Sequence, residues 1–191
     1  MPIALSNSVK FVFWQTTLFF MNHIYKPTGP IPKKISGDNY EKGKAFEEFV
    51  INLFNKHSFH LKEWRQAQKF IDTSLPMDYF NPDLELELVF TGKGKYRFAV
   101  ECKWRRDFSS GKIRWAKKHQ IVAYEKFQSE RRIPVFIAIG IGGEPANPGR
   151  LYVTPLVNIS NNIEVCESQL IPFGRKPTRK FFYDIKQLVL F

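Results

Sequence analysis

Cysteine is scarce in this sequence: Cys102 and Cys166 are the two occurrences among 191 residues. Their separation matches neither a disulfide framework nor the ligand spacing of a zinc site. The scarcity argues against a disulfide-stapled secreted fold and against a cysteine-based metal centre. Reduced thiols are typical of a reducing compartment, so we expect a cytoplasmic protein.

A long hydrophobic run is also missing. The most apolar stretch of the N-terminal region, Phe11–Met21, has eleven residues interrupted by polar ones, whereas a membrane span needs about twenty apolar residues. A signal peptide would need a basic start, and only Lys10 precedes this run. We expect residues 1–37 to be an apolar arm followed by a Pro/Gly-rich connector, with Met21 as an alternative start of the chain. We do not expect membrane association, although docking of the arm to a membrane or a partner stays an alternative.

Acidic residues are few beside basic ones. Asp and Glu number 18 against 29 Lys and Arg, which gives a net charge of +11. An excess of this size favours an anionic partner, and nucleic acid is the usual one. No helix-turn-helix pattern, zinc-finger pattern or internal repeat is present to indicate reading of a base sequence. The chain length suits one domain with a sizeable core.

The first helix is expected from Asp38 to about Lys56. Asp38 followed by Glu41 resembles a capping box at its start. A buried stripe at helical spacing is formed by Phe46, Phe49, Val50, Leu53 and Phe54. Glu47 lies at the edge of this stripe, so of the acids on the helix it is the one that could face an active site.

A hairpin is expected next, after a strand over Phe59–Arg65. Leu84–Phe90 alternates leucine with acid, Thr91–Lys95 is a turn, and Tyr96–Trp104 is the return strand. If the turn centres on Lys93, Asp83 lies opposite Lys103 and Glu85 opposite Glu101. Acids on a strand are most often a solvated face, which is how we interpret Glu85 and Glu87. Asp83, Glu101 and Lys103 differ, because the second strand is so apolar that its charged groups should be partly buried.

The remaining pattern predicts a second helix over Ile113–Gln128, strands over Pro134–Gly142 and Leu151–Val157 with a loop over Gly142–Gly149 between them, and a short helix or strand over Phe181–Phe191. The expected fold is therefore α/β, with a mixed central β-sheet flanked by helices in αβββαβ order. Three acids and a lysine on one hairpin face suit a divalent cation, because Mg²⁺ prefers carboxylate, water and phosphate oxygens.

These residues resemble the PD-(D/E)xK nuclease superfamily, which has the restriction-endonuclease-like fold. Its signature reads here as Pro82-Asp83, seventeen residues, and Glu101-Cys102-Lys103. Gly43–Glu47 resembles the first motif of that family, and Gln120–Tyr124 resembles the Gln-x-x-x-Tyr element of its RecB-like members. The likeness spans about Asp38–Val157. We expect residues 38–160 to form the core domain and residues 161–191 to be a basic C-terminal extension packed on it.

The resemblance implies a set of roles. Asp83, Glu101 and the backbone carbonyl of Cys102 would bind Mg²⁺ or Mn²⁺, and Lys103 would orient or deprotonate the attacking water. Glu47 would complete the site directly or through water. Asp78 and Glu85 are rivals of Asp83 as the metal ligand. Gln120 would be a buried amide that contacts the catalytic strands or a substrate phosphate, or would make a structural bond to the backbone.

A basic rim is expected beside these acids. It comprises Arg105, Arg106, Lys112, Arg114, Lys117 and Lys118, and we expect Tyr124 to contact nucleic acid together with them. Such cations supply most of the sequence-independent affinity for phosphates. The sequence thus predicts a metal-dependent nuclease that hydrolyses phosphodiester bonds, a restriction- or resolvase-like DNA endonuclease with no small-molecule cofactor. The alternative is an inactive nucleic-acid-binding module on the same fold. A homodimer is compatible with either function.

Overall fold

The computed structural model describes residues 33–34, 37–65, 70–71, 80–90, 92 and 94–191. Most of the predicted N-terminal arm lies outside these residues, as does Asp78. Among the helices of the described ranges, none has both the length and the apolar character needed to span a membrane. The two long helices are α2 (Gly37–Leu53) and α3 (Lys118–Arg131).

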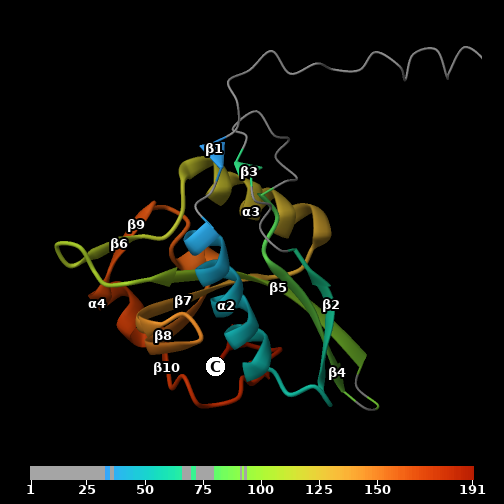
Figure 1. Ribbon diagram of the computed structural model, residues 1–191. Coiled ribbons are helices and arrows are strands. Elements are labelled where there is room, and N and C mark those ends of the chain that lie inside the picture. Colours follow the sequence, from blue (N-terminus) through green and yellow to red (C-terminus); the bar gives the residue numbers. More distant parts are fainter. Residues whose placement is uncertain (1–32, 35–36, 66–69, 72–79, 91, 93) are drawn as a thin grey trace, which may run out of the picture. The chain divides into compact units, whose positions relative to one another are not determined.

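A six-stranded mixed sheet forms the centre of the fold (Figure 1). Its strands follow the order β10 (Gly174–Arg175), β8 (Asn147–Pro155), β7 (Val135–Glu144), β5 (Gly94–Arg105), β4 (Leu84–Phe90) and β2 (Phe59–Trp64). β5 and β7 are parallel, and the other neighbours are antiparallel. A parallel pair needs a crossover, which α3 supplies. The predicted α/β class, mixed sheet and order of the principal elements are confirmed.

The helix α2 covers one face of this sheet. Its residues Phe46, Val50 and Leu53 pack on the even-numbered residues of β4 and β5, which include Leu86, Phe98 and Val100. The Phe46 ring lies directly on Gly140 of β7, where an added Cβ would lie 2.4 Å from Cε2 of Phe46. Real Cβ contacts do not come so near, so a side chain at Gly140 would force the Phe46 ring to move.

The start of α2 differs from the prediction. The helix begins at Gly37, so Asp38 lies inside its first turn and not before it. The Asp38 carboxylate accepts a hydrogen bond from the Lys42 ammonium, 2.6 Å away and one turn later, instead of capping the helix. The helix ends at Leu53, three residues before the predicted limit, and Phe54 turns into the core just beyond it.

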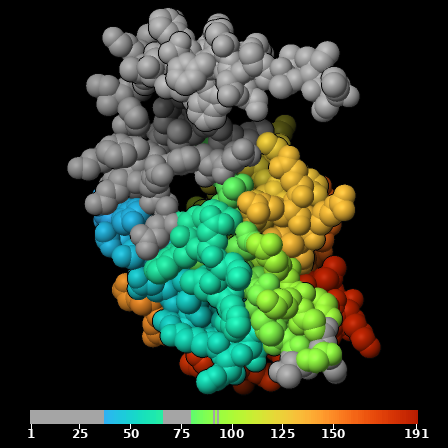
Figure 2. Space-filling view, turned by 90° about the vertical axis from the view of Figure 1, so that its right-hand side faces the viewer, coloured from blue at the N-terminus to red at the C-terminus, as the bar shows by residue number. Residues whose placement is uncertain are grey.

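The hairpin β4–β5 forms with a shifted register. Leu84 lies opposite Val100 and Glu85 opposite Ala99, so the predicted pairs Glu85–Glu101 and Asp83–Lys103 are wrong. The shift is two residues, which preserves parity, so odd-numbered residues of both strands still share a face. The solvated setting predicted for the acids of β4 is also wrong, because Glu85 is 1% exposed and Glu87 8%. Figure 2 shows the outer side of this region, where the teal surface that includes β2 adjoins the green surface of the hairpin.

The segment before α3 is a strand where a helix was predicted. β6 (Lys112–Arg114) pairs with β9 (Glu164–Cys166), and α3 begins only at Lys118. The reason is a period of two: Ile113 and Trp115 are buried, whereas Lys112 and Arg114 are exposed. Trp115 joins the residues of α3 that cover the second face of the sheet, among them Ile121, Tyr124 and Phe127.

The C-terminal half contains tighter turns than the sequence indicated. β7 runs on to Glu144 and β8 starts at Asn147, so a hairpin replaces most of the loop predicted over Gly142–Gly149. The shorter elements are β1 (Lys33–Lys34), β3 (Phe70–Ile71), the 3₁₀ helices η2 (Leu156–Asn158) and η3 (Ile171–Phe173), and α4 (Glu167–Leu170). The last residues form the strands β11 (Tyr183–Asp184) and β12 (Val189–Leu190), with Phe181 and Tyr183 in the core beneath α2.

Candidate active site

Asp83 is fixed at the point where β4 begins. The ladder between β4 and β5 starts at Leu84, so Cys102 of β5 would oppose Pro82 if the strand continued. The Pro82 carbonyl instead accepts a hydrogen bond from Nη1 of Arg65, at 2.9 Å. Oδ2 of Asp83 takes its place and accepts the Cys102 N–H at 2.7 Å. A carboxylate thus completes the backbone ladder and is bound directly to the Glu101–Lys103 segment.

The Cys102 carbonyl lies at the same strand edge. In an extended strand the N–H and C=O of one residue point to the same neighbour, so this carbonyl also faces the start of β4. A continued ladder would supply the N–H of residue 82 to it, but Pro82 has none. The Pro-Asp pair therefore leaves the Cys102 carbonyl without a backbone N–H donor from residue 82. It also places the Asp83 carboxylate beside that carbonyl. This arrangement suits the predicted role of the Cys102 carbonyl as a ligand.

Glu101 is the most deeply buried acid of the motif, with 2% of its surface exposed. Its Oε1 accepts a hydrogen bond from the Tyr124 hydroxyl at 2.6 Å and forms an ion pair with the Lys103 ammonium. Its Oε2 is buried and has no hydrogen-bond partner among the described residues. A buried carboxylate oxygen without a partner is costly, so this atom marks a place for a cation or a donor.

Lys103 is held in its charged form. Burial lowers the pKa of its ammonium, but the negative charges of Glu101 and Asp83 outweigh burial and leave the pKa above its ordinary value. An ammonium group with a raised pKa is a poor base near neutral pH. Of the two roles predicted for Lys103, orientation of the attacking water fits this setting better than its deprotonation.

Glu47 approaches from α2, on the opposite face of the sheet. It is 4% exposed, and its Oε2 accepts a hydrogen bond from Nε1 of Trp64 at 2.6 Å. Burial, helped by the negative charge of Glu101, raises the pKa of Glu47 from 4.5 to about 7. Burial also raises the pKa of Asp83 well above its usual range, again with Glu101 contributing. The acids therefore repel one another in the absence of a cation.

The donor set fits a small hard cation in part. Among the described residues, no group of three or more His, Cys, Asp or Glu side chains is arranged to hold a metal. Mg²⁺ is often bound through one or two carboxylates and completes its shell with water and substrate phosphate. Asp83 and Glu101 supply two carboxylates. The Oε2 atom of Glu101, which is buried and has no partner among the described residues, is the atom most in need of a cation. The residues thus fit Mg²⁺ or Mn²⁺ as a two-carboxylate site.

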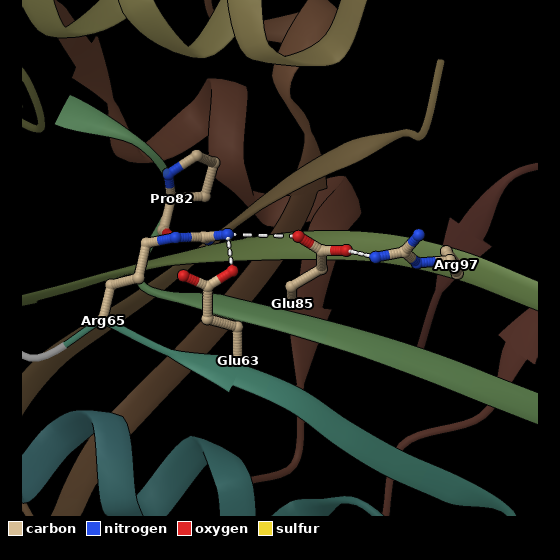
Figure 3. A network of polar contacts seen from close by, with 5 residues as sticks. All are labelled: Glu63, Arg65, Pro82, Glu85 and Arg97. Carbon is tan, nitrogen blue, oxygen red and sulfur yellow. Dashed lines mark hydrogen bonds and ion pairs between the residues drawn. The ribbon is translucent and has the colours of Figure 1, made fainter. Parts of the chain in front are cut away.

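Glu85, a predicted rival of Asp83, is engaged elsewhere. Its Oε2 accepts a hydrogen bond from Nη2 of Arg65 at 3.1 Å, and its Oε1 pairs with the Arg97 guanidinium (Figure 3). Arg65 also pairs with Glu63 in this network. With both oxygens held by arginines and Ala99 opposite it, Glu85 is a structural acid in this arrangement, which favours Asp83 as the ligand.

Arg65 is a residue of the site that sequence reasoning missed. Its backbone N–H donates to the Asp83 carbonyl at 2.7 Å. Its guanidinium, which lies beside Pro82 in Figure 3, donates to the Pro82 carbonyl. The same guanidinium lies 5.3 Å from the ring centroid of Phe127 on α3. One side chain therefore joins the Pro-Asp pair to β4 and α3. No motif flagged it, and its place at a strand end was the one available signal.

Gln120 differs from its prediction. It is half-buried at the start of α3, where its Oε1 accepts the backbone N–H of Lys117 at 3.0 Å and caps the helix. The contact found is the structural alternative, a hydrogen bond to backbone. The backbone group that it meets, the Lys117 N–H, lies at the start of the helix and not in the core. Tyr124, predicted to contact nucleic acid, is 1% exposed and instead touches Glu101. The Tyr of this element therefore reaches the acids, and the Gln positions the helix that carries it.

The predicted basic rim separates into two kinds of residue. Arg105 donates from Nε to the Arg114 carbonyl at 2.8 Å and from Nη2 to the Trp115 carbonyl at 3.2 Å, so it clamps β5 to β6. Burial lowers the pKa of its guanidinium. Arg114 forms an ion pair with Glu164. Arg114 is exposed, as are Arg106, Lys112, Lys117 and Lys118, and the last three of these lie on β6 and at the beginning of α3.

Comparison with solved structures finds a likeness in fold. No family model and no curated protein matches the chain. A solved structure of Hjc, a Holliday junction resolvase from the archaeal hyperthermophile Archaeoglobus fulgidus, is similar with a TM-score of 0.46 and 15% sequence identity. The match covers 73% of this chain and 95% of that one. A likeness of this degree does not by itself assign a family or an activity.

Proposed function

We propose that this protein is a metal-dependent nuclease that hydrolyses phosphodiester bonds, with DNA as its substrate and an endonucleolytic mode of cleavage. One observation carries the proposal: the buried, unpartnered Oε2 of Glu101 lies in the segment to which the Asp83 carboxylate is bound. These residues make up the PD-(D/E)xK signature that the sequence resembles. The juxtaposition brings both carboxylates and the ammonium of Lys103 to one strand edge.

Each residue of the site has a defined task in this proposal. Asp83, Glu101 and the Cys102 carbonyl would hold Mg²⁺ or Mn²⁺, which when bound polarises a phosphate oxygen and lowers the pKa of a coordinated water. Tyr124 fixes the orientation of Glu101 through its hydroxyl. Glu47 can accept or hold a proton near neutral pH, because its pKa is about 7.

Lys103 is suited to stabilise charge. Its ammonium stays protonated beside Glu101 and Asp83, so it can orient a water by donating a hydrogen bond. It can also offset the negative charge that grows on the phosphorus-bound oxygens in the transition state. Arg106, Lys112, Lys117 and Lys118 are exposed and follow the site along the chain, which supports a role in contacting the phosphate backbone.

The second candidate is an inactive nucleic-acid-binding module. The ion pair between Lys103 and Glu101 favours it. It is also favoured because the described residues hold no group of three or more His, Cys, Asp or Glu side chains arranged to bind a metal. Both candidates predict salt-sensitive binding of DNA. They differ in whether the Asp83, Glu101 and Lys103 side chains matter beyond folding.

Cleavage of supercoiled DNA, linear DNA and RNA with Mg²⁺, Mn²⁺ or EDTA tests the proposal. We expect metal-dependent nicking of DNA that is lost in Asp83→Asn and Lys103→Met. Lys62→Met, at an exposed lysine of β2, is the matched control and should cleave normally. Nicking that persists in both site variants would overturn the site assignment. Binding without cleavage of any substrate would favour the inactive module.

A further inference from the structure

The C-terminal tail encloses a hollow on the α2 side of the sheet. Its volume is about 680 Å³, within the range of about 300–1,000 Å³ that is usual for ligand pockets. The side chains that define its chemistry are four cations and three phenylalanines, and none of the described residues that line it is acidic. The cations are Arg175, Lys176, Arg179 and Lys180.

Two of these cations are committed to the fold. The Lys180 ammonium donates to the Asn52 carbonyl in the last turn of α2, a helix that has no basic residue of its own there. It therefore caps the negative end of the helix dipole. Arg175 donates from Nε to the Leu190 carbonyl at 3.3 Å, and its guanidinium lies 5.7 Å from the ring centroid of Phe191.

The other two cations have no such task. Lys176 and Arg179 lie at the ends of a turn, closed by the Arg179 N–H donating to the Lys176 carbonyl at 3.0 Å. Both side chains are exposed, and neither has a hydrogen bond or ion pair to any described residue. Two neighbouring cations on a short turn offer donors for a phosphate group.

An aromatic pair stands beside them. The rings of Phe182 and Phe191 are stacked with centroids 5.8 Å apart and planes 21° from parallel. Their backbones exchange two hydrogen bonds, with N···O distances of 2.5 and 2.9 Å, which hold the pair in place. Phe182 is nevertheless 55% exposed and Phe191 39%. Ring faces held rigidly and left open to solvent are suited to stack on a planar ligand.

We propose that this hollow binds a nucleotide unit of single-stranded nucleic acid, with the base stacked on Phe182 and the phosphate on Lys176 and Arg179. Stacking platforms combined with cations are the usual means of binding single strands without sequence preference. Lys180, which lines the hollow, is hydrogen-bonded to the Asn52 carbonyl of α2. Asn52 follows Glu47 by five residues, so the two are separated by about 8 Å along the helix axis. The strand would therefore pass on the α2 side of the sheet.

Binding of a fluorescent twelve-residue deoxythymidine oligomer to the full chain in EDTA tests this site, so that the result does not depend on catalysis. We expect Phe182→Ala to weaken binding about tenfold, the effect of losing one stacked base, and Phe182→Tyr to bind as wild type. Lys176→Glu/Arg179→Glu should weaken binding more than tenfold. The charge-matched control, Lys62→Glu/Lys186→Glu, should weaken it less than threefold. Free thymidine monophosphate should compete, and inorganic phosphate alone should compete less well.

Three results would overturn the proposal. Wild-type affinity in Phe182→Ala, with its unfolding temperature unchanged, would show that no base stacks there. An equal loss of affinity in Lys176→Glu/Arg179→Glu and in Lys62→Glu/Lys186→Glu would show that only the overall charge of the protein matters. Phe182-dependent binding to vesicles of anionic lipid, without Phe182-dependent binding of the oligomer, would assign the surface to a membrane instead. Failure of cleavage leaves this proposal standing, and failure of stacking leaves the nuclease proposal standing.

Discussion

Two buried glutamates on the same face of adjacent strands have opposite environments. Glu85 of β4 is 1% exposed, and arginine guanidinium groups hold both of its oxygens (Figure 3). Glu101 of β5 is 2% exposed, and its one partnered oxygen is shared by Lys103 and Tyr124. Its other oxygen is buried with no partner among the described residues. Sequence pattern alone does not separate these two acids.

We interpret the difference as that between an acid that stabilises the fold and an acid that takes part in the proposed reaction. A buried carboxylate with both oxygens paired is compensated within the chain, so its removal leaves unpaired arginines behind. A carboxylate with one oxygen unsatisfied carries a standing cost that folding alone does not explain. If this distinction holds, changes at Glu85 should alter stability and changes at Glu101 should alter activity.

The largest expected effect is on catalysis in Glu101→Gln. The amide loses the charge that would hold a cation, so we expect DNA nicking to fall about a thousandfold. Asp83 still neutralises Lys103, so the unfolding temperature should change less than in Glu85→Gln. Nicking assays and thermal unfolding on the same preparation measure both effects. Near-wild-type nicking would show that the unpartnered oxygen is not part of the site.

Glu85→Gln should have the reverse outcome. Arg65 and Arg97 lose their common anion, and we expect a loss of about 2 kcal/mol in the free energy of unfolding, less than for a fully buried pair because Arg97 is partly exposed. Nicking should fall less than tenfold. Glu87→Gln is the control: Glu87 is 8% exposed and its ion pair, at 3.7 Å, is with the exposed Lys95, so its effect should stay below about 1 kcal/mol. Denaturant unfolding measures these changes, and equal losses in both variants would contradict the comparison.

Arg65→Lys sharpens the comparison, because Arg65 contacts both Glu85 and the Pro-Asp pair. A single ammonium cannot reproduce the fork that reaches Pro82 and Glu85 together. We expect the Mg²⁺ concentration for half-maximal nicking to rise about tenfold, a usual effect of changing a residue that holds a metal ligand in position. The maximal rate should be preserved. A metal titration of the nicking rate measures this shift. An unchanged requirement, in a variant that is still folded, would limit Arg65 to a structural role.

The smallest effect concerns Glu47 and pH. The folded state binds a proton more tightly than the unfolded state, because the pKa of Glu47 rises from 4.5 to about 7. The contribution of Glu47 to stability is therefore fully present below about pH 4.5 and lost as pH rises to about 7. Glu47→Gln lacks this loss, so in EDTA its unfolding temperature should gain on wild type as pH increases. Glu48→Gln, at the exposed neighbouring acid, should follow the wild-type curve. A constant difference between Glu47→Gln and wild type would contradict the raised pKa.

The features that were predictable are local. Alternation of leucine and acid identifies β4, and parity alone puts Glu101 and Lys103 on one face with Asp83. The register was not predictable, because Gly92 and Gly94 both take positive φ angles and allow the turn to centre at more than one residue. The start of α3 was predicted too early for another reason. Ile113 and Ala116 fit a helical spacing, but Ile113 and Trp115 are buried at a spacing of two residues in a segment that pairs with β9 as a strand.

Contacts between segments that are distant in the chain could not be predicted from the sequence. The pairing of Arg65 with Glu85 joins residues 20 positions apart, and nothing in either strand announces it. The burial of Tyr124 against Glu101 required the crossover of α3 to be in place. Sequence reasoning named the acids and the lysine, but it did not distinguish the paired acid from the unpaired one.

The hydrogen bond between the Asp83 carboxylate and the Cys102 N–H also makes site assembly observable. This amide hydrogen is protected while the bond is formed, so it exchanges with solvent when the Asp83 carboxylate separates from β5. Its exchange rate therefore reports the closure of the site in solution, without substrate and without cleavage. Replacing Asp83 by Ala should expose the Cys102 amide while more central amides of β5, such as that of Val100, stay protected. The NMR signal of this one amide would then report whether the Asp83 carboxylate is bound to β5.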